Sequence, residues 1–325
     1  MSTPFVWMDR RVDLSRRTLR WATTTALVMS VLIVVGGSVV RVTGSGLGCP
    51  EWPACTENSL SPTHEMGIHG IIEFANRLLT FVLCAAVGWA IVAARLQRDR
   101  QKNITKWGWI QFWVVVLNAV VGGMTVWAEL SPYVVAGHFI AATLLLTAAT
   151  ITWDKARKVD STTGTAAPDS DPVIMSQLLV FVTAVLIIIG TVVTGTGPHA
   201  GDSAEIHRIP LDWSIITVIH GTVAVLATVI GLVIWSSLRD GSNPAALKRS
   251  KMFVAVIAAQ GVIGIVQSLT NLPELMVVLH VVGAALVWIG ALRLLLDTRR
   301  PVHSTVTDTA GTDPAATHPR PTKHT

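Results

Sequence analysis

Long apolar runs separated by short polar segments dominate the chain. Eight of these runs are long enough to cross a bilayer, because a transmembrane helix needs about 20 consecutive apolar residues. The runs predict membrane spans at residues 21–42, 67–94, 107–128, 133–153, 174–196, 213–237, 252–270 and 275–296. The pattern therefore predicts an all-α integral membrane protein with eight transmembrane helices.

Composition and charge placement agree with this fold class. Hydrophobic residues make up 51% of the 325 residues and charged residues 14%, whereas a soluble domain carries about 25% charged residues. All 25 Lys and Arg residues except Arg41, Arg77 and Arg208 fall on one side of the predicted spans. Because basic residues mark the cytoplasmic side, we expect both termini in the cytoplasm. The net charge of +5 thus indicates membrane topology and lipid contact rather than a nucleic-acid partner.

A polar stretch divides the chain into two halves. Residues 154–173 contain Ser, Thr, Pro and Asp, which is typical of a linker, here on the cytoplasmic side. The linker separates an N-terminal half (21–153) from a C-terminal half (174–296), which we expect to form two tandem four-helix bundles. Residues 1–20 are the predicted cytoplasmic N-terminus, and residues 297–325 are predicted to be a disordered cytoplasmic tail.

The two halves repeat each other. The spacing that carries His69 to His220 also carries TGSG, at the end of the first span, to TGTG at the end of the fifth. A nearly equal spacing carries His138 to His280. An internal duplication accounts for these matches. Both halves hold an even number of spans, so they are parallel repeats about an axis along the membrane normal.

Four histidines at repeat-related positions are the main candidates for chemistry. His69, His138, His220 and His280 each lie within about two turns of the outer end of a span, so the two rings of one half can face each other. Facing imidazoles suit an iron porphyrin held edge-on between helices. The alternative is a structural role, with each ring bonded to a carbonyl or hydroxyl group. Zinc is a weaker competitor, because no Cys or carboxylate lies at the spacing of a four-ligand site.

Glu73 and Arg77 lie one turn apart within the second span, where charged groups are costly. One interpretation is an i,i+4 ion pair that stabilises the fold. Against this, the repeat spacing places Glu73 on Ala224 and Arg77 on Thr228. The asymmetry suggests that the N-terminal half carries out chemistry, with Glu73 as proton donor or acceptor, while the C-terminal half holds a cofactor.

The loop GSGLGCPEWPAC, residues 44–55, contains two cysteines on the predicted outer side. Disulfides persist in that oxidising environment, so a structural bond between Cys49 and Cys55 is the first interpretation. A redox role stays open, because a short exposed ring is easily reduced.

Several stretches together resemble the heme A synthase family, in its actinobacterial branch: GGSVVRVTGSGLGCPEWPAC, IIEFANRL, AGHF, TGTGPHAGD and VLH. The resemblance covers all eight predicted spans. It implies an oxidoreductase of the bacterial plasma membrane that serves cytochrome oxidase cofactor biosynthesis. The implied reaction oxidises the C8 methyl group of heme O to a formyl group, through successive hydroxylations with water as oxygen source.

The resemblance also implies roles for single residues. His220 and His280 correspond to the axial ligands of a heme b cofactor in the C-terminal half. The N-terminal half corresponds to the part that binds heme O, through His138 and a ligand from the second span. Glu73 corresponds to the family's catalytic glutamate. Cys49 and Cys55 correspond to the family's outer-loop pair.

One position departs from the family pattern. Many members have a histidine where this chain has Asn76, directly before Arg77. We therefore expect His69 to be the second-span ligand of the substrate heme, with Asn76 as a contact to that heme. Charge placement also makes Arg41, Arg77 and Arg208 candidates to pair with propionate groups.

Two other classes of function compete with this interpretation. A diheme transmembrane electron-transfer protein of the quinol or ferric reductase type should hold ligands near both membrane faces, whereas all four histidines lie near one face. A heme transporter would need buried charges in its cytoplasmic half, where the spans show none. The expected partners are heme O, membrane lipid, heme O synthase, cytochrome oxidase assembly factors and a second copy of the chain.

Overall fold

The computed structural model describes residues 13–99, 101–159, 170–199, 201–202, 207–241 and 243–300. Within these residues the structure is helical, and eight helices are long and apolar enough to cross a membrane. The long helices are α2 (Arg16–Val42), α3 (Gly67–Arg95), α4 (Lys102–Trp127), α5 (Pro132–Lys158), α6 (Ser170–Thr196), α7 (Trp213–Ser237), α8 (Pro244–Leu269) and α9 (Glu274–Thr298). The 3-10 helix η1 (His64–Met66) directly precedes α3. The predicted all-α membrane fold is confirmed.

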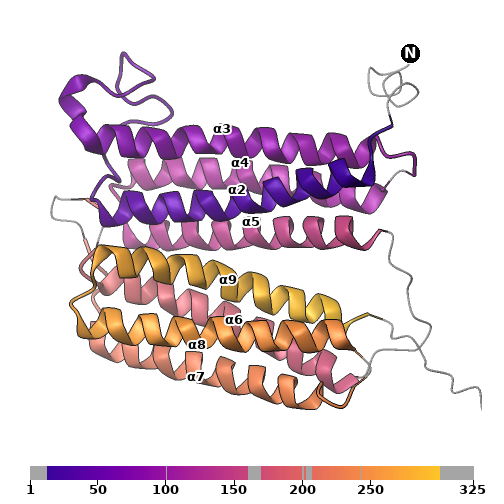
Figure 1. The fold of residues 1–325 in the computed structure, drawn as a ribbon. Helices are drawn as coiled ribbons and strands as arrows, with labels where there is room; N and C mark the ends of the chain where they lie inside the picture. The colour runs from indigo at the N-terminus through magenta and orange to yellow at the C-terminus, as the bar shows by residue number, and fades with distance from the viewer. Residues whose placement is uncertain are drawn as a thin grey trace, which may run out of the picture.

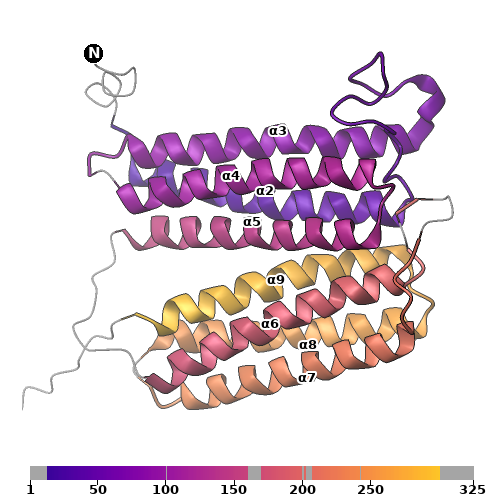
Figure 2. The same cartoon turned by 180° about the vertical axis from the view of Figure 1, so that it is seen from behind.

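The helices pack in two groups of four. Helices α2 to α5 pack against one another, and α6 to α9 pack against one another (Figure 1). Helix α9 joins the groups by contacting α2 and α5, and α5 also contacts α6 (Figure 2). We call the first group the N-terminal half and the second group the C-terminal half.

The helices extend beyond the apolar runs at one end of the molecule only. At the predicted outer end, the observed boundaries agree with the predicted spans within one residue. At the opposite end, α2 begins at Arg16 and α8 at Pro244, several residues before the apolar runs. Likewise, α5 continues to Lys158 and α6 begins at Ser170, so both helices enter the predicted linker. The predicted tail beyond residue 300 lies outside the described residues.

Capping groups explain these early helix starts. The Ser15 side chain accepts a hydrogen bond from the Thr18 N–H at the start of α2. Asn243 does the same for the Ala246 N–H at the start of α8, where Pro244 occupies the first helical position. Such caps satisfy backbone N–H groups that have no partner within the helix. Hydropathy does not report them, so the apolar run marks the membrane core rather than the helix.

The same unusual turn occurs in both halves. Glu129 and Leu130 join α4 to α5 with φ values of 46° and 56°, and Asn271 and Leu272 join α8 to α9 with values of 59° and 57°. In each turn the leucine N–H donates to a carbonyl of the preceding helix. A positive φ is unfavourable for a leucine, so its recurrence at matching positions supports the predicted duplication.

Ion pairs tie the two halves together at the end opposite the cysteine loop. Asp154 of α5 and Asp297 of α9 are only 7% and 4% exposed. Lys158 lies 3.1 Å from the Asp297 carboxylate, Arg249 lies 3.2 Å from it, and Arg300 lies 3.8 Å from the Asp154 carboxylate. Buried carboxylates are tolerated when they are paired in this way. We call these five residues the basal ion-pair cluster.

Candidate functional site

Two imidazole rings face each other inside the C-terminal half. His220 comes from α7 and His280 from α9, and their ring centroids lie 6.3 Å apart with the planes at 61°. His220 is the eighth residue of its helix and His280 the seventh, so the two rings reach a similar depth. The structure therefore brings together the pair that the duplicated sequence predicts for this half.

Glycines on the preceding helices make room for these rings. A Cβ atom added at Gly190 of α6 would lie 3.1 Å from His220 Cε1, and one added at Gly264 of α8 would lie 3.5 Å from His280 Cε1. The N-terminal half repeats the arrangement, with Gly122 of α4 at 3.2 Å from His138 Cε1. Three of the four predicted histidines thus lie against a glycine of the neighbouring helix.

The same three rings share an unmet hydrogen-bonding need. The Nδ1 atoms of His138, His220 and His280 are buried and make no hydrogen bond of regular geometry, although the Leu186 carbonyl lies near the His220 ring. Leaving a buried polar atom unpaired costs about 1–3 kcal/mol, so one such ring is unusual. Three equivalent ones favour imidazoles arranged for a group outside the polypeptide over purely structural histidines.

His69 differs from the other three histidines. It is only the third residue of α3 and is exposed, and its Nδ1 lies 3.0 Å from Ser45 Oγ. Ser45 itself is fully buried and also contacts the Thr43 hydroxyl at 2.8 Å. His69 and His138 show no ring contact like that of His220 with His280. The N-terminal half therefore does not reproduce the facing pair in this structure.

Glu73 is a buried acid of the N-terminal half that accepts three hydrogen bonds. It is 6% exposed, and its Oε2 accepts a hydrogen bond of 2.6 Å from the Cys49 N–H. Its Oε1 accepts from the Arg77 guanidinium, through Nε at 3.1 Å and through a second nitrogen. The predicted i,i+4 ion pair is therefore present, and the cysteine loop adds a third donor to the same carboxylate.

Arg77 binds the cysteine loop as well as Glu73. Its guanidinium donates to three loop carbonyls, those of Glu51 and Ala54 at 2.9 Å each and that of Cys49 at 3.1 Å. A planar guanidinium presents several donors in a fixed fork, so one side chain can fix both the acid and the loop. Sequence reasoning found the Glu73–Arg77 pair but not these loop contacts, because only the folded loop turns its carbonyls inward.

The cysteine loop closes over the end of the N-terminal half. Cys49 and Cys55 form a disulfide, and both residues are fully buried. Trp52 of the same loop stacks edge-on against Trp127, with ring centroids 5.4 Å apart. Trp52 also lies so close to Gly123 of α4 that no larger residue fits there without displacing the ring. The predicted disulfide is therefore present, as part of a compact cap over Glu73.

Asn76 lies within the N-terminal half, one turn beyond Glu73 on α3. Its side-chain Oδ1 is buried without a hydrogen-bond partner. The same oxygen contacts Gly36 of α2 so closely that any side chain there would clash with it. Asn76 is thus a further polar group of this half whose acceptor has no partner in the protein.

The C-terminal half has no counterpart of the acid and its cap. At the repeat-related positions it carries Ala224, Ala227 and Thr228, whose hydroxyl bonds only to its own helix, at the Ala224 carbonyl. Among the described residues, no group of three His, Cys, Asp or Glu side chains could hold a metal ion. The two halves therefore offer different chemistry on the same helical frame.

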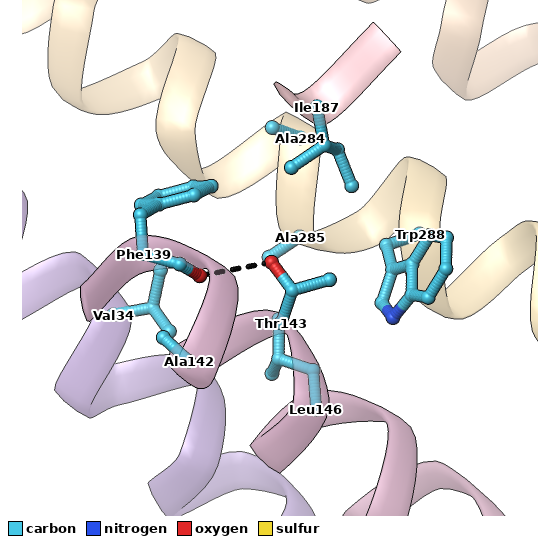
Figure 3. Close-up of a pocket in the computed structure, with 9 residues that line it drawn as sticks. All are labelled: Val34, Phe139, Ala142, Thr143, Leu146, Ile187, Ala284, Ala285 and Trp288. Carbon is cyan, nitrogen blue, oxygen red and sulfur yellow. Dashed lines mark hydrogen bonds between the residues drawn. The ribbon is translucent and has the colours of Figure 1, made fainter. Parts of the chain in front are cut away.

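An apolar pocket lies where the two halves meet (Figure 3). Phe139 and Thr143 of α5 face Ala284, Ala285 and Trp288 of α9 across it. Phe139 follows His138 directly, and Ala284 lies one turn after His280. The Trp288 indole donates to the Thr147 hydroxyl at 2.9 Å and so fixes α9 against α5. This packed junction connects the surroundings of the histidines in the two halves.

Together, these features define a multi-pass helical membrane protein. One half holds a pair of neighbouring imidazoles, and the other half holds an anchored carboxylate. The chain belongs to the COX15-CtaA family of cytochrome oxidase assembly proteins, whose family model matches residues 19–292. The matching relatives are bacterial, which places this multi-pass protein in a plasma membrane.

Relatives named heme A synthase match part of the chain. The protein from Lysinibacillus sphaericus is 29% identical over 147 residues, which cover 42% of this chain and 46% of the relative. The protein from Geobacillus thermodenitrificans is 32% identical over 114 residues, or 34% of each chain. The protein from Bacillus cereus is 30% identical over 105 residues, or 32% of each chain. The matched segment thus spans less than half the length of these curated relatives.

Proposed function

We propose that this protein is a heme A synthase, an oxidoreductase that converts heme O to heme A by oxidising the C8 methyl group to a formyl group. The observation that carries this proposal is the division of labour between the halves, with His220 facing His280 in one and Glu73 held beneath the disulfide loop in the other. The relatives named heme A synthase support the same reaction.

A heme b cofactor fits the C-terminal half. His220 and His280 present two neutral nitrogen ligands of the kind that iron takes on its two faces. The glycines beside the rings leave room for such a group, and neither ring has a hydrogen bond of regular geometry at Nδ1 that would commit it to a purely structural role. When bound, the heme supplies one-electron redox chemistry. In the protein, His220 and His280 would hold the iron, and the apolar side chains around them would exclude water.

The N-terminal half is the proposed site for heme O as substrate. His138 lies against an equivalent glycine, Gly122, and its Nδ1 is unpartnered like those of the two proposed cofactor ligands. We therefore assign it to the substrate iron. His69 is the proposed ligand from α3, because the Ser45 contact occupies Nδ1 and leaves Nε2 unbonded. Fixing one ring nitrogen in this way orients the other toward a metal. Asn76 is the proposed polar contact to the same substrate.

Glu73 is the proposed proton acceptor of the reaction. Oxidation of a methyl group to a formyl group consumes one water and releases four protons and four electrons, so the site needs a base and an electron path. The Cys49 N–H and the Arg77 guanidinium stabilise the anionic carboxylate. A carboxylate has about four acceptor positions, so these donors still leave Glu73 a free lone pair for a proton.

The junction between the halves is the proposed electron path. Phe139 and Ala284 place the neighbourhoods of His138 and His280 on either side of one dry, packed contact. Electrons taken from the substrate would reach the cofactor of the C-terminal half through it. Heme O synthase, cytochrome oxidase assembly factors and a second copy of the chain are the proposed protein partners.

Heme extraction after co-expression tests the proposal. The chain would be produced in a host that makes heme O but lacks its own heme A synthase, and the extracted hemes would be separated by mass and absorption. We expect hydroxylated heme O and heme A. Unchanged heme O alongside a normal bound-heme spectrum would instead favour a diheme electron-transfer protein that does not modify heme.

A matched pair of variants tests the substrate ligands. His69→Ala and Asn76→Ala remove the two α3 candidates one at a time without touching the C-terminal half. We expect His69→Ala to change the spectrum of added heme O and Asn76→Ala to leave the iron spectrum unchanged while weakening binding. The reverse result would assign the α3 ligand role to Asn76.

A further inference from the structure

A second pocket lies at the outer junction of the two halves. Arg41, in the last turn of α2, lines it together with Arg208 and His207 from the segment before α7. Pro132 and Val135 of the first turn of α5 form another wall. The pocket thus gathers basic side chains from both halves at the end of α5 that leads to His138.

The two arginines lack acidic partners within the described residues. Arg41 donates to the Thr194 carbonyl and Arg208 to the Pro198 carbonyl, each at 2.8 Å. Both acceptors are neutral, and no ion pair of the described chain involves either arginine. None of the described residues that line the pocket is acidic. Among the described residues, two positive charges therefore share one pocket that no acidic side chain lines.

Arg41 also has a donor without a partner. Its Nε is buried and makes no hydrogen bond, although the same guanidinium reaches across to α6. Arg41 and Arg208 are close enough to repel each other electrostatically. Holding like charges together near a membrane is costly, and a bound anion removes that cost. The arrangement is therefore one that an anionic ligand would stabilise.

We propose that Arg41 and Arg208 form a binding site for an anionic oxygen group, a carboxylate or a phosphate, at the outer junction of the halves. Guanidinium groups suit both groups because they donate paired, charge-assisted hydrogen bonds. His207 adds a further ring nitrogen to the same pocket.

The position of the pocket indicates two sources for the anionic group. Pro132 precedes His138 by six residues, a rise of about 9 Å along α5, so a porphyrin bound at His138 has its edge near the pocket. In that case the site binds a propionate of the substrate, and this reading rests on the proposed function. The pocket also lies at the outer end of the membrane spans, where lipid headgroups carry phosphate.

Heme binding with and without free propionates separates these sources. The full chain, purified with its own heme, would be titrated with hemin and with hemin dimethyl ester, and the change in absorption would give each dissociation constant. The variants are Arg41→Gln, Arg208→Gln and Arg41→Lys, with Arg17→Gln at the other end of α2 as the control. We expect the two Gln variants to weaken hemin binding by about 10- to 100-fold and to leave ester binding unchanged.

The lipid arm uses thermal unfolding of the same proteins in phosphatidylcholine and in phosphatidylglycerol nanodiscs. A stabilisation by phosphatidylglycerol that both Gln variants lose, with hemin binding unchanged, would assign the site to a lipid phosphate. Equal loss of hemin and ester binding would show a structural role and overturn the proposal. Unchanged hemin binding together with unchanged thermal unfolding would overturn it as well. Conversion of heme O is measured separately, so its failure in the unmodified chain would count against the proposed function alone.

Discussion

The two halves of this protein share a backbone plan but differ in what their second helices carry. Helix α7 of the C-terminal half presents His220 to His280 and otherwise holds small or apolar residues near it. Helix α3 of the N-terminal half presents Glu73 and Arg77 to a disulfide-closed loop. Duplication thus supplied one frame, on which α3 carries an anchored acid and α7 carries only the imidazole.

Removing the facing histidines should have the largest effect. His220→Ala or His280→Ala removes a proposed ligand of the heme iron, so we expect loss of the bound-heme absorption and of detectable heme A. The matched change His69→Ala, at the repeat-related position, should leave the as-purified heme in place. Loss of that heme in His69→Ala would show that the halves do not divide their roles as described.

Glu73→Gln should have the second-largest effect on conversion. It keeps the shape and the hydrogen bond from Cys49 but removes the proton-accepting charge, so conversion should fall by about 10²- to 10⁴-fold. The as-purified heme spectrum should be unchanged, because Glu73 lies in the other half. Glu65→Gln, an exposed acid just before α3, is the control and should convert heme O normally. A lost spectrum in Glu73→Gln would make this acid structural.

Arg77→Lys should have a smaller effect with a distinct signature. Lysine keeps the charge beside Glu73 but has three donors on one nitrogen, too few for the Glu73 carboxylate and three loop carbonyls together, so the loop should loosen. We expect conversion to drop by about tenfold. The Cys49–Cys55 disulfide should also react faster with a mild reductant, which labelling of the freed thiols would measure. Normal conversion with normal thiol reactivity would show that the fork of Arg77 does not position the loop.

The glycines that contact the histidines should give the smallest and most local effects. An alanine at Gly190 places its Cβ 3.1 Å from His220, which is tighter than ordinary contact, whereas one at Gly264 lies at 3.5 Å from His280. Overpacking costs about 1–3 kcal/mol, so Gly190→Ala should weaken heme retention by about tenfold. Gly264→Ala should retain the heme like the unmodified chain. Equal retention in the two variants would mean that the α6–α7 contact relaxes freely.

Patterns along the chain were enough to predict the fold and much of the site. Apolar runs predicted all eight helices, because the bilayer requires a fixed length of apolar residues. Repeat spacing singled out His69, His138, His220 and His280, and the missing repeat of Glu73 marked the acid. These signals lie in the linear order of the residues, so a single sequence displays them.

Contacts made by tertiary packing could not be predicted in the same way. Ser45 beside His69, Gly190 beside His220 and the loop carbonyls around Arg77 depend on how two helices or a loop approach each other. Helix α3 begins at Gly67, where the apolar run predicts its start, and η1 occupies the residues directly before it. That start explains why His69 is nearer its helix end than its repeat partner.

The basal ion-pair cluster determines how a large planar molecule can enter. Asp154 and Asp297, with their cationic neighbours, close the inner end of the junction between α5 and α9. In the proposed function, a porphyrin would then enter the junction from the side, at the end away from this cluster. A protein that synthesises the incoming pigment in the same membrane can hand it over laterally, without releasing it to water.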